Sequence, residues 1–290
     1  MLISAALVGA RLAHYAALTI LFGLSLFPFY AGGPRPIRRP VLIAAALTVP
    51  VSGLLWLMFS TATMSGDLAA AFDPATLAQV VREMAFGRIW AARLALALLT
   101  LGLVMVRPGS RWIPALGGLM LASIALTGHA QMEAGPSRLI HMGADGLHLL
   151  AAGVWLGALI PILALARQTG SDQVALGAIL ARFSRTATLA VATLVGSGLV
   201  NAGFLVGSVQ GLVSTDYGHL LMIKLVLFAG MLGLAAHNRW RLTPRLLAAG
   251  AAADLRGQLR RQVLAEQVLG LLVLAVVALM GTSDPASSSA

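Results

Sequence analysis

The chain has 290 residues, of which 59% are hydrophobic and 10% charged, and its formal net charge is +10. Soluble domains carry about a quarter charged residues, so this composition excludes an ordinary globular protein and favours one that crosses a bilayer several times. The arginines cluster between apolar runs, as topology signals do, and therefore do not indicate nucleic-acid binding. The absence of cysteine excludes disulfides, thiolate sites and iron–sulfur clusters.

Eight apolar runs are long enough to cross a hydrocarbon core, and segments of this length must be helical in lipid. The expected fold is all-α, a polytopic membrane helix bundle over residues 1–281, followed by a disordered outer tail over 282–290. The first run is too long for a cleaved signal peptide, so we expect it to be retained. The eight expected transmembrane helices are Leu2–Tyr30, Val41–Thr61, Phe86–Val106, Trp112–Ala130, Leu139–Ala166, Phe183–Gly207, Tyr217–His237 and Val263–Gly281.

The loops between these spans alternate in charge. The even-numbered loops are acidic and carry few bases: Asp67, Asp73, Glu83, Glu133 and Asp216. By the positive-inside rule both termini face outward. The odd-numbered loops carry only two acids, Asp172 and Asp254, among the arginines Arg35, Arg38, Arg39, Arg107, Arg111, Arg167, Arg182, Arg185, Arg239, Arg241, Arg245, Arg256, Arg260 and Arg261.

Two loops are predicted to contain helices of their own. Asp73 followed by Pro74 is a typical helix start, with an N-cap and proline at the first helical position. Apolar residues then recur at helical spacing up to Met84, which predicts a short helix lying on the outer surface. The arginine-rich stretch from Pro244 to Gln262 predicts an amphipathic helix on the inner side. No convincing internal repeat is visible.

Ionisable groups inside the expected spans gather in one layer near the outer surface. His141, Asp145 and His148 have the spacing i, i+4, i+7, which places them on one helix face. His129 and Met132 precede them across a short loop containing Gly135-Pro136, so spans four and five are expected to be neighbours. Imidazole, thioether and carboxylate are metal-ligand groups. We therefore predict metal ligation by His129, Asp145 and His148, with capture of the ion by His141 and Met132 and a further ligand in His14.

Other polar residues of this layer suit supporting roles. Arg11, Arg93 and Lys224 cannot ligate a cation, so we expect them to act as counter-charges to Asp145 or to hold an anion. Asn201 is expected beside them. Trp155, Gly153 and Gly157 are expected to pack helices closely, since small residues three positions apart let backbones approach.

The order of these motifs resembles the copper resistance protein D (CopD) family. Thr127-Gly128-His129-Ala130 ends one span, and Asp145, His148, Trp155 and Gly157 follow in the next. The resemblance covers most of the chain and is closest over residues 127–281. It continues through RFSRTATLAVATLVGSGLVNAG from Arg182, TDYGHLLMIK from Thr215, AAHNRWRLTP from Ala235, and Glu266 in the last span.

The resemblance implies a multi-pass protein of the bacterial inner membrane that handles copper. The family is thought to move copper inward, often beside a periplasmic copper-binding partner, CopC. Carried over by position, His129, Asp145 and His148 match the family's polar residues, and His14 resembles its first-span histidine. Few metal ligands are visible below the outer layer, so the residues favour outer binding more clearly than translocation.

Two other functions remain open. The protein could be a b-type haem protein in which His14 or His129 pairs with His148 as axial ligands, with Arg11 or Arg93 holding the propionates. It could also be a structural or docking protein whose polar layer fastens the helices together. No nucleophile–base arrangement or phosphate-binding loop stands out, so we expect a binding or transport protein rather than an enzyme.

Overall fold

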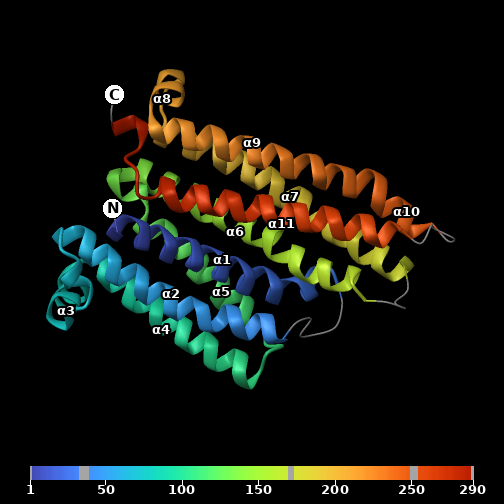
Figure 1. The fold of residues 1–290 in the computed structure, drawn as a ribbon, viewed down its shortest axis with the longest axis horizontal. Helices are drawn as coiled ribbons and strands as arrows, with labels where there is room; N and C mark the ends of the chain where they lie inside the picture. The colour runs from blue at the N-terminus through green and yellow to red at the C-terminus, as the bar shows by residue number, and fades with distance from the viewer. Residues whose placement is uncertain (1, 33–38, 169–172, 249–253, 289–290) are drawn as a thin grey trace.

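The computed structural model describes residues 2–32, 39–168, 173–248 and 254–288, and all regular secondary structure within them is helical. Long helices lie side by side in one bundle (Figure 1). Seven helices of the described residues are long and apolar enough to cross a membrane. They are α1 (Leu2–Tyr30), α2 (Arg39–Ser65), α4 (Ala85–Val106), α6 (Gly135–Ala166), α7 (Gln173–Leu205), α9 (Asp216–His237) and α11 (Leu255–Met280).

The expected fourth span is shorter than predicted. Helix α5 covers Trp112–Ala122 and continues as a 3₁₀ turn, η2, over Ser123–Thr127. The hydroxyls of Ser123 and Thr127 donate to carbonyls three residues back, at 2.7 and 3.1 Å, which satisfies the tightened turn. His129 therefore lies beyond this helix, in the separate turn η3 (His129–Met132).

The loop helices were predicted with mixed success. Helix α3 (Pro74–Glu83) is present as expected, and the Asp73 carboxylate caps it by accepting from the N–H groups of Ala75 and Thr76. It follows the short turn η1 (Leu68–Ala71). Its counterpart between α7 and α9 is α8 (Val209–Ser214).

The amphipathic inner helix predicted over residues 244–262 is wrong as a separate element. Helix α9 runs through a π-helical turn, η4 (Asn238–Leu242), into the short helix α10 (Thr243–Leu247). Residues 255–262 instead begin α11, because Leu255, Leu259 and Val263 are buried at a spacing of four and carry the apolar stripe straight into the bundle.

Parts of other predictions fall on residues that the structure does not describe. Arg35, Arg38 and Asp172 of the loop charges lie outside the described residues, as do 249–253 of the amphipathic segment and 289–290 of the tail. We expected disorder after residue 281. The described part of that segment contains the 3₁₀ turn η5 (Ala286–Ser288), and Ala286 is buried against Val206 and Tyr217.

The order of elements repeats. Helices α1, α2, α4 and α5 form a first half, and α6, α7, α9 and α11 form a second half. Each half has a short helix, α3 or α8, between its second and third long helices. Each also contributes most of one large hydrophobic cluster. The two halves meet where α1 crosses α6.

Two glycines allow this crossing to be close. A Cβ atom on Gly23 would lie 2.6 Å from the Cα atom of Gly157, and a Cβ atom on Gly157 would lie 2.6 Å from the Cα atom of Gly23. Gly153 also lies in this contact, against Phe22. The predicted packing role of Gly153 and Gly157 therefore agrees with the geometry, since no larger residue would fit between the backbones.

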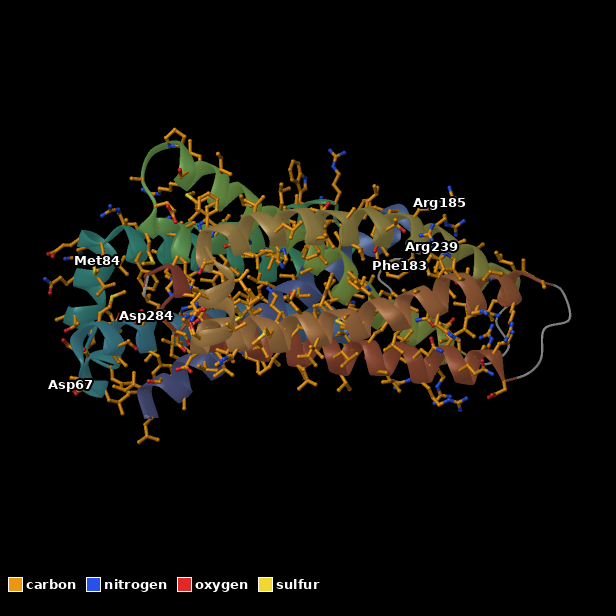
Figure 2. All side chains as sticks on the ribbon, turned by 90° about the horizontal axis from the view of Figure 1, so that it is seen from above. Asp67, Met84, Phe183, Arg185, Arg239 and Asp284 are labelled. Atoms are coloured by element: carbon orange, nitrogen blue, oxygen red, sulfur yellow. The ribbon has the colours of Figure 1, made fainter. Side chains whose placement is uncertain are left out.

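The two ends of the bundle differ in charge. Both described chain ends, α3 and α8 lie at one end, which we call the terminal end (Figure 1). Asp67 and Asp284 lie there, whereas Arg185 and Arg239 lie toward the opposite, arginine end (Figure 2). The four labelled charges thus divide between the ends as the loop pattern predicted.

Candidate functional site

His148 lies on α6 and is held by a serine of α7. Its Nδ1 atom is 3.0 Å from the Oγ atom of Ser197. That hydroxyl has one proton and lies 2.5 Å from the carbonyl oxygen of Thr193, to which it donates. We therefore assign the tautomer in which Nδ1 of His148 carries the proton and donates to Ser197. The Nε2 atom keeps its lone pair, the form in which imidazole binds a metal.

His14, on α1, has the same arrangement with α2. Its Nδ1 atom is 3.1 Å from the Oγ atom of Ser52, which donates to the carbonyl of Thr48 at 2.6 Å. The ring is 1% exposed, and its centroid lies 5.6 Å from that of Trp56 and 5.2 Å from that of Trp90. Its Nε2 atom is buried and has no hydrogen-bond partner among the described residues.

Asp145 lies one turn before His148 on α6. A Cβ atom on Gly128 would be 3.6 Å from the Oδ2 atom of Asp145, so the carboxylate faces the turn that leads to His129. Lys224, on α9, is close enough to interact electrostatically with both Asp145 and His148. This basic residue is therefore the counter-charge that the carboxylate has in the structure.

The two arginines expected beside Asp145 bind elsewhere. Arg11 donates to the carbonyl of Gly281 at the end of α11. Arg93 is 2% exposed, and it donates to the Oγ atom of Ser123 at 2.9 Å and to the carbonyl of the same residue at 2.7 Å. Arg93 therefore ties α4 to the turn η2 and does not reach the carboxylate.

His129 lies at the start of η3, where its ring meets Tyr217 edge-on at 6.1 Å between centroids. Burial lowers the pKa of His129 below its usual value of 6.5, and the charge of Arg11 adds to this effect. The Met280 carbonyl, which hydrogen-bonds the ring, partly offsets the shift. The ring is therefore held neutral at pH 7, and its Nε2 atom has no partner among the described residues.

We expected His141 to lie at the surface, but the structure buries it. It is 2% exposed, because its ring stacks on Phe204 with centroids 4.7 Å apart, and its Nδ1 atom lies 4.0 Å from the Oε1 atom of Glu133. Met132, by contrast, is exposed as predicted. Asn201 lies one turn after Ser197, and its Oδ1 atom is buried without a partner in the described chain.

The predicted ligands do not form a single cluster. Within the described ranges, no three histidine or acidic side chains lie close enough together to hold one ion. They instead form a series of neighbours at the terminal end. His141 and His129 interact electrostatically, His129 contacts Tyr217, and Tyr217 interacts in turn with Asp145.

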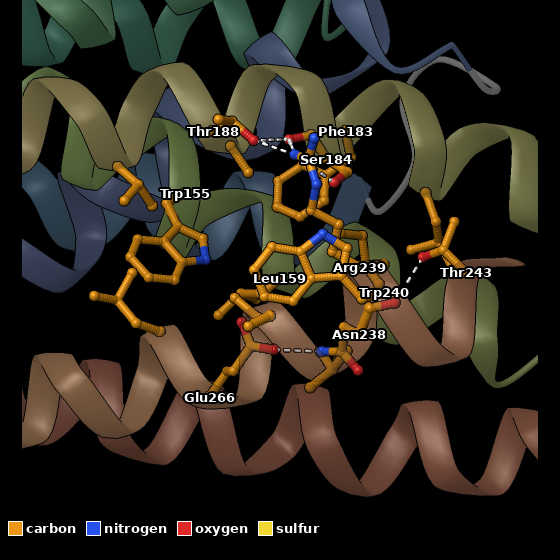
Figure 3. A pocket seen from close by; sticks show the side chains of 18 of the residues that line it. Trp155, Leu159, Phe183, Ser184, Thr188, Asn238, Arg239, Trp240, Thr243 and Glu266 are labelled. Carbon is orange, nitrogen blue, oxygen red and sulfur yellow. Dashed lines mark hydrogen bonds between the residues drawn. The ribbon is translucent and has the colours of Figure 1, made fainter.

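A second polar feature lies deeper in the second half, toward the arginine end. A cavity of about 330 Å³ separates α7 from α9 and is floored by α6 and α11 (Figure 3). Trp155 lines this cavity, in addition to the packing role that we predicted for it. Glu266 also lines it and is 2% exposed, with its Oε1 atom accepting from the Nδ2 atom of Asn238 at 2.5 Å. Arg239 closes the side nearest the arginine end by donating to the Ser184 carbonyl at 3.0 Å.

Sequence reasoning missed several residues that shape the site. Ser52 and Ser197 decide which ring nitrogen is free, Tyr217 links His129 to Asp145, and Phe204 covers His141. A signal for the serines was present: both follow a threonine by four residues and precede a glycine, as Thr-x-x-x-Ser-Gly.

Comparison with known proteins supplies the family. Residues 1–139 match the description "Copper resistance protein D-like, N-terminal domain", and residues 177–280 match "Copper resistance protein D". No solved structure matches the chain. Copper resistance protein D of Pseudomonas syringae pv. tomato is 33% identical over 96% of each chain.

Two further relatives are similar over most of the chain. Inner membrane protein YebZ of Escherichia coli is 28% identical over 96% of this chain and 98% of its own. Copper transport protein CutJ of Bacillus subtilis is 30% identical over 93% of this chain and 51% of its own length. With both family descriptions matched in order and a relative similar throughout, the chain belongs to the copper resistance protein D family.

Proposed function

We propose that this protein binds copper at its terminal end and moves it inward across the bacterial inner membrane, for copper homeostasis or resistance. One observation carries the proposal. Ser197 fixes Nδ1 of His148 and leaves Nε2 free, one helical turn from the carboxylate of Asp145. Imidazole and carboxylate both bind copper, and a neutral His129 on the adjoining turn is a further ligand.

The proposed orientation has both termini in the periplasm. Eight crossings then form one membrane domain over residues 1–281, with α5 and η2 as a short fourth crossing. The arginines at the opposite end support this orientation, since cytoplasmic loops are enriched in lysine and arginine. The similarity to an inner membrane protein of Escherichia coli supports the location.

The inner cavity supports the transport part of the proposal. A path needs more than one site along its length. Glu266 supplies a buried carboxylate below His148, at a cavity between α7 and α9. The names of the Pseudomonas and Bacillus relatives, a copper resistance protein and a copper transport protein, agree with this function.

Capture at the periplasmic face is the remaining step. Met132 is exposed on the turn η3 beside His129, and thioether sulfur favours Cu(I). We propose that a CopC-like periplasmic protein delivers copper there.

The two other candidate functions have weaker grounds. The haem alternative is disfavoured for the His14–His148 pair, because the His14 ring is packed between two indoles. A purely structural or docking role would require the free lone pairs around His148 to serve no ligand, and it predicts variants that lose stability but no copper.

The test is copper analysis of protein purified from copper-supplemented cells. Wild type is expected to retain copper and His148→Ala to lose it. His219→Ala is a matched control, because His219 is an exposed histidine whose Nε2 atom bonds the Val213 carbonyl. Unchanged copper in His148→Ala would overturn the proposed site, and a Soret band would move the protein to the haem class.

A further inference from the structure

The two halves of the bundle carry matching residues at matching places. His14 and Gly23 are nine residues apart, as are His148 and Gly157. The Cβ position of Gly23 faces the backbone of Gly153, and the Cβ position of Gly157 faces the carbonyl of Thr19. Thr19 and Gly153 are equivalent positions, because each lies five residues after the histidine of its own half. Such reciprocal contacts are characteristic of a twofold relation between two copies of one unit.

Other helices repeat the relation. The third long helix of each half begins with an aromatic residue, a glycine and a basic residue: Phe86-Gly87-Arg88 in one and Tyr217-Gly218-His219 in the other. Gly87 packs on the backbone of α3 and Gly218 on that of α8. In the fourth helix, Gly117 meets Phe22 and Gly270 meets Leu156, which are again equivalent positions.

The histidines therefore occupy equivalent cradles. Each donates from Nδ1 to the serine of a Thr-x-x-x-Ser-Gly segment in the next helix. A Cβ atom on the glycine of that segment would lie 3.2 Å from Cε1 of His14 in the first half and 3.4 Å from Cε1 of His148 in the second. The four-helix unit thus contains one imidazole site, present twice.

The surroundings of the two sites have diverged. Three residues before the histidine, the first half has Arg11 and the second has Asp145. One turn after the serine, the first half has Trp56 and the second has Asn201. Trp90 of α4, whose indole packs on His14, is replaced at the equivalent position of α9 by Leu221.

The unsatisfied atoms differ in kind as well. Around His14 the buried atoms without partners in the described chain are Nε2 of His14 itself and three N–H donors, on Arg11, Trp90 and Arg93. In the second half they include Oδ1 of Asn201, one turn after Ser197. Nε2 of His129 is another such atom, on the turn η3, where the ring contacts Tyr217 and interacts with Arg11.

A cation needs lone pairs and is repelled by positive charge. Arg93 acts on His14 in the first half, and its equivalent in the second half is Lys224, which acts on His148. Only in the second half does an acid, Asp145, interact with that base, so the second cradle opposes a cation less than the first.

We infer that the protein is a duplicated unit in which only the second half keeps a cation site, and that the first half is a locked structural copy. The charges around the two histidines make the difference: Asp145 interacts with Lys224 beside His148, whereas Arg93 acts on His14 and the residue three positions before His14 is a second base, Arg11. This inference rests on the proposed copper function for the identity of the ion. His14 then acts in packing, contrary to its predicted role as a ligand.

Two matched pairs of variants test the inference, His14→Ala with His148→Ala and Ser52→Ala with Ser197→Ala. Cu(I) is titrated into the purified full chain against a chromophoric chelator, and thermal unfolding is measured in the same detergent. Wild type is expected to bind one copper per His148 site. Ser197→Ala is expected to weaken affinity about 10–100-fold, the usual effect of removing a residue that orients a ligand. His148→Ala abolishes this binding.

The first-half variants are expected to keep wild-type copper affinity and to unfold at lower temperature. Equal loss of copper from both members of a pair, or a second ion lost in His14→Ala, would overturn the inference. If wild type binds no copper, the proposed function fails, and unfolding alone decides the inference. Lower melting temperatures in the first-half variants than in the second-half variants would then support it, and equal ones would overturn it. If His14→Ala does not fold, Ser52→Ala takes its place as the first-half variant.

Discussion

A histidine buried among apolar helices is costly unless its N–H group finds an acceptor. Ser52 and Ser197 supply that acceptor, and each can do so because its own proton is already donated to a carbonyl one turn back. The serine thereby leaves the second nitrogen bare. At His148 this fixed lone pair is the one that the proposed copper site uses, whereas at His14 the same hydrogen bond secures a packed ring.

His129 makes the stability of the terminal end depend on pH. Its pKa is lowered by burial, so between the folded-state value and 6.5 the unfolded chain binds more protons than the folded one. Stability from this residue is present above about pH 6.5 and is lost as the pH falls. The melting temperature of wild type should fall more steeply from pH 7 to pH 5 than that of His129→Gln. Equal slopes would contradict the prediction.

Glu266 is expected to matter for passage and not for capture. Glu266→Gln keeps an oxygen that can accept from Asn238, so the cavity should persist while its ionisable carboxyl group is lost. Copper uptake into sealed vesicles should fall by about tenfold or more, within the range seen when the surroundings of a metal are altered. Copper retained by the purified variant should match wild type. Unchanged uptake, or loss of both properties, would count against an inner site.

Among the elements, the α1–α6 crossing holds the halves together with no room to spare. Gly23→Ala would place a methyl group 2.6 Å from the Cα atom of Gly157, so the helices must separate. Overpacking of this kind costs about 1–3 kcal/mol. The variant should unfold at a lower temperature in detergent.

Gly9→Ala is the control for this variant. It lies on the same helix, and a methyl group there would meet nothing within 4 Å. Its unfolding temperature should equal or exceed that of wild type, because alanine favours a helix over glycine. Equal destabilisation by both variants would mean that the crossing is not the tight contact.

Whether the ends of a helix could be predicted from the sequence depends on which interactions determine those ends. Helix α1 begins and ends at the predicted residues, and α3 begins at its predicted cap, because apolar length and local capping are read directly from sequence. The end of α5 could not be read, since hydroxyls at Ser123 and Thr127 tighten an apolar run that looks continuous. The start of α11 was obscured because its arginines mask a buried stripe of leucines.

The site was predictable in its residue types and not in its grouping. His14, His148, Asp145 and Lys224 were recognised as ionisable groups within apolar runs. Their distribution over two cradles depends on the duplication, which the sequence hides. Equivalent histidines are 134 residues apart but equivalent serines are 145 apart, since the loops differ in length. The shared residues are mostly glycine, serine and threonine, which carry little signal individually.

For the molecule as a whole, the duplication explains how one bundle combines rigidity with a binding site. In the first half, α2 packs along α4, and the indoles of Trp56 and Trp90 stack at 4.9 Å between centroids. In the second half, the equivalent helices α7 and α9 are separated by the cavity above Glu266. One copy thus supplies a filled scaffold, and the other supplies the space and lone pairs that the proposed path for copper requires.

The orientation of the whole molecule can be tested because the chain has no cysteine. A single cysteine at Asp67 lies at the terminal end, and one at Arg245 lies beyond α9 at the other end; both positions are exposed. In intact spheroplasts, a membrane-impermeant maleimide should label Asp67→Cys, and it should label Arg245→Cys only after the membrane is opened. The cysteine-free parent gives the background. The reverse pattern would place the histidine layer in the cytoplasm, so that copper would be bound on leaving the cell and not on arrival.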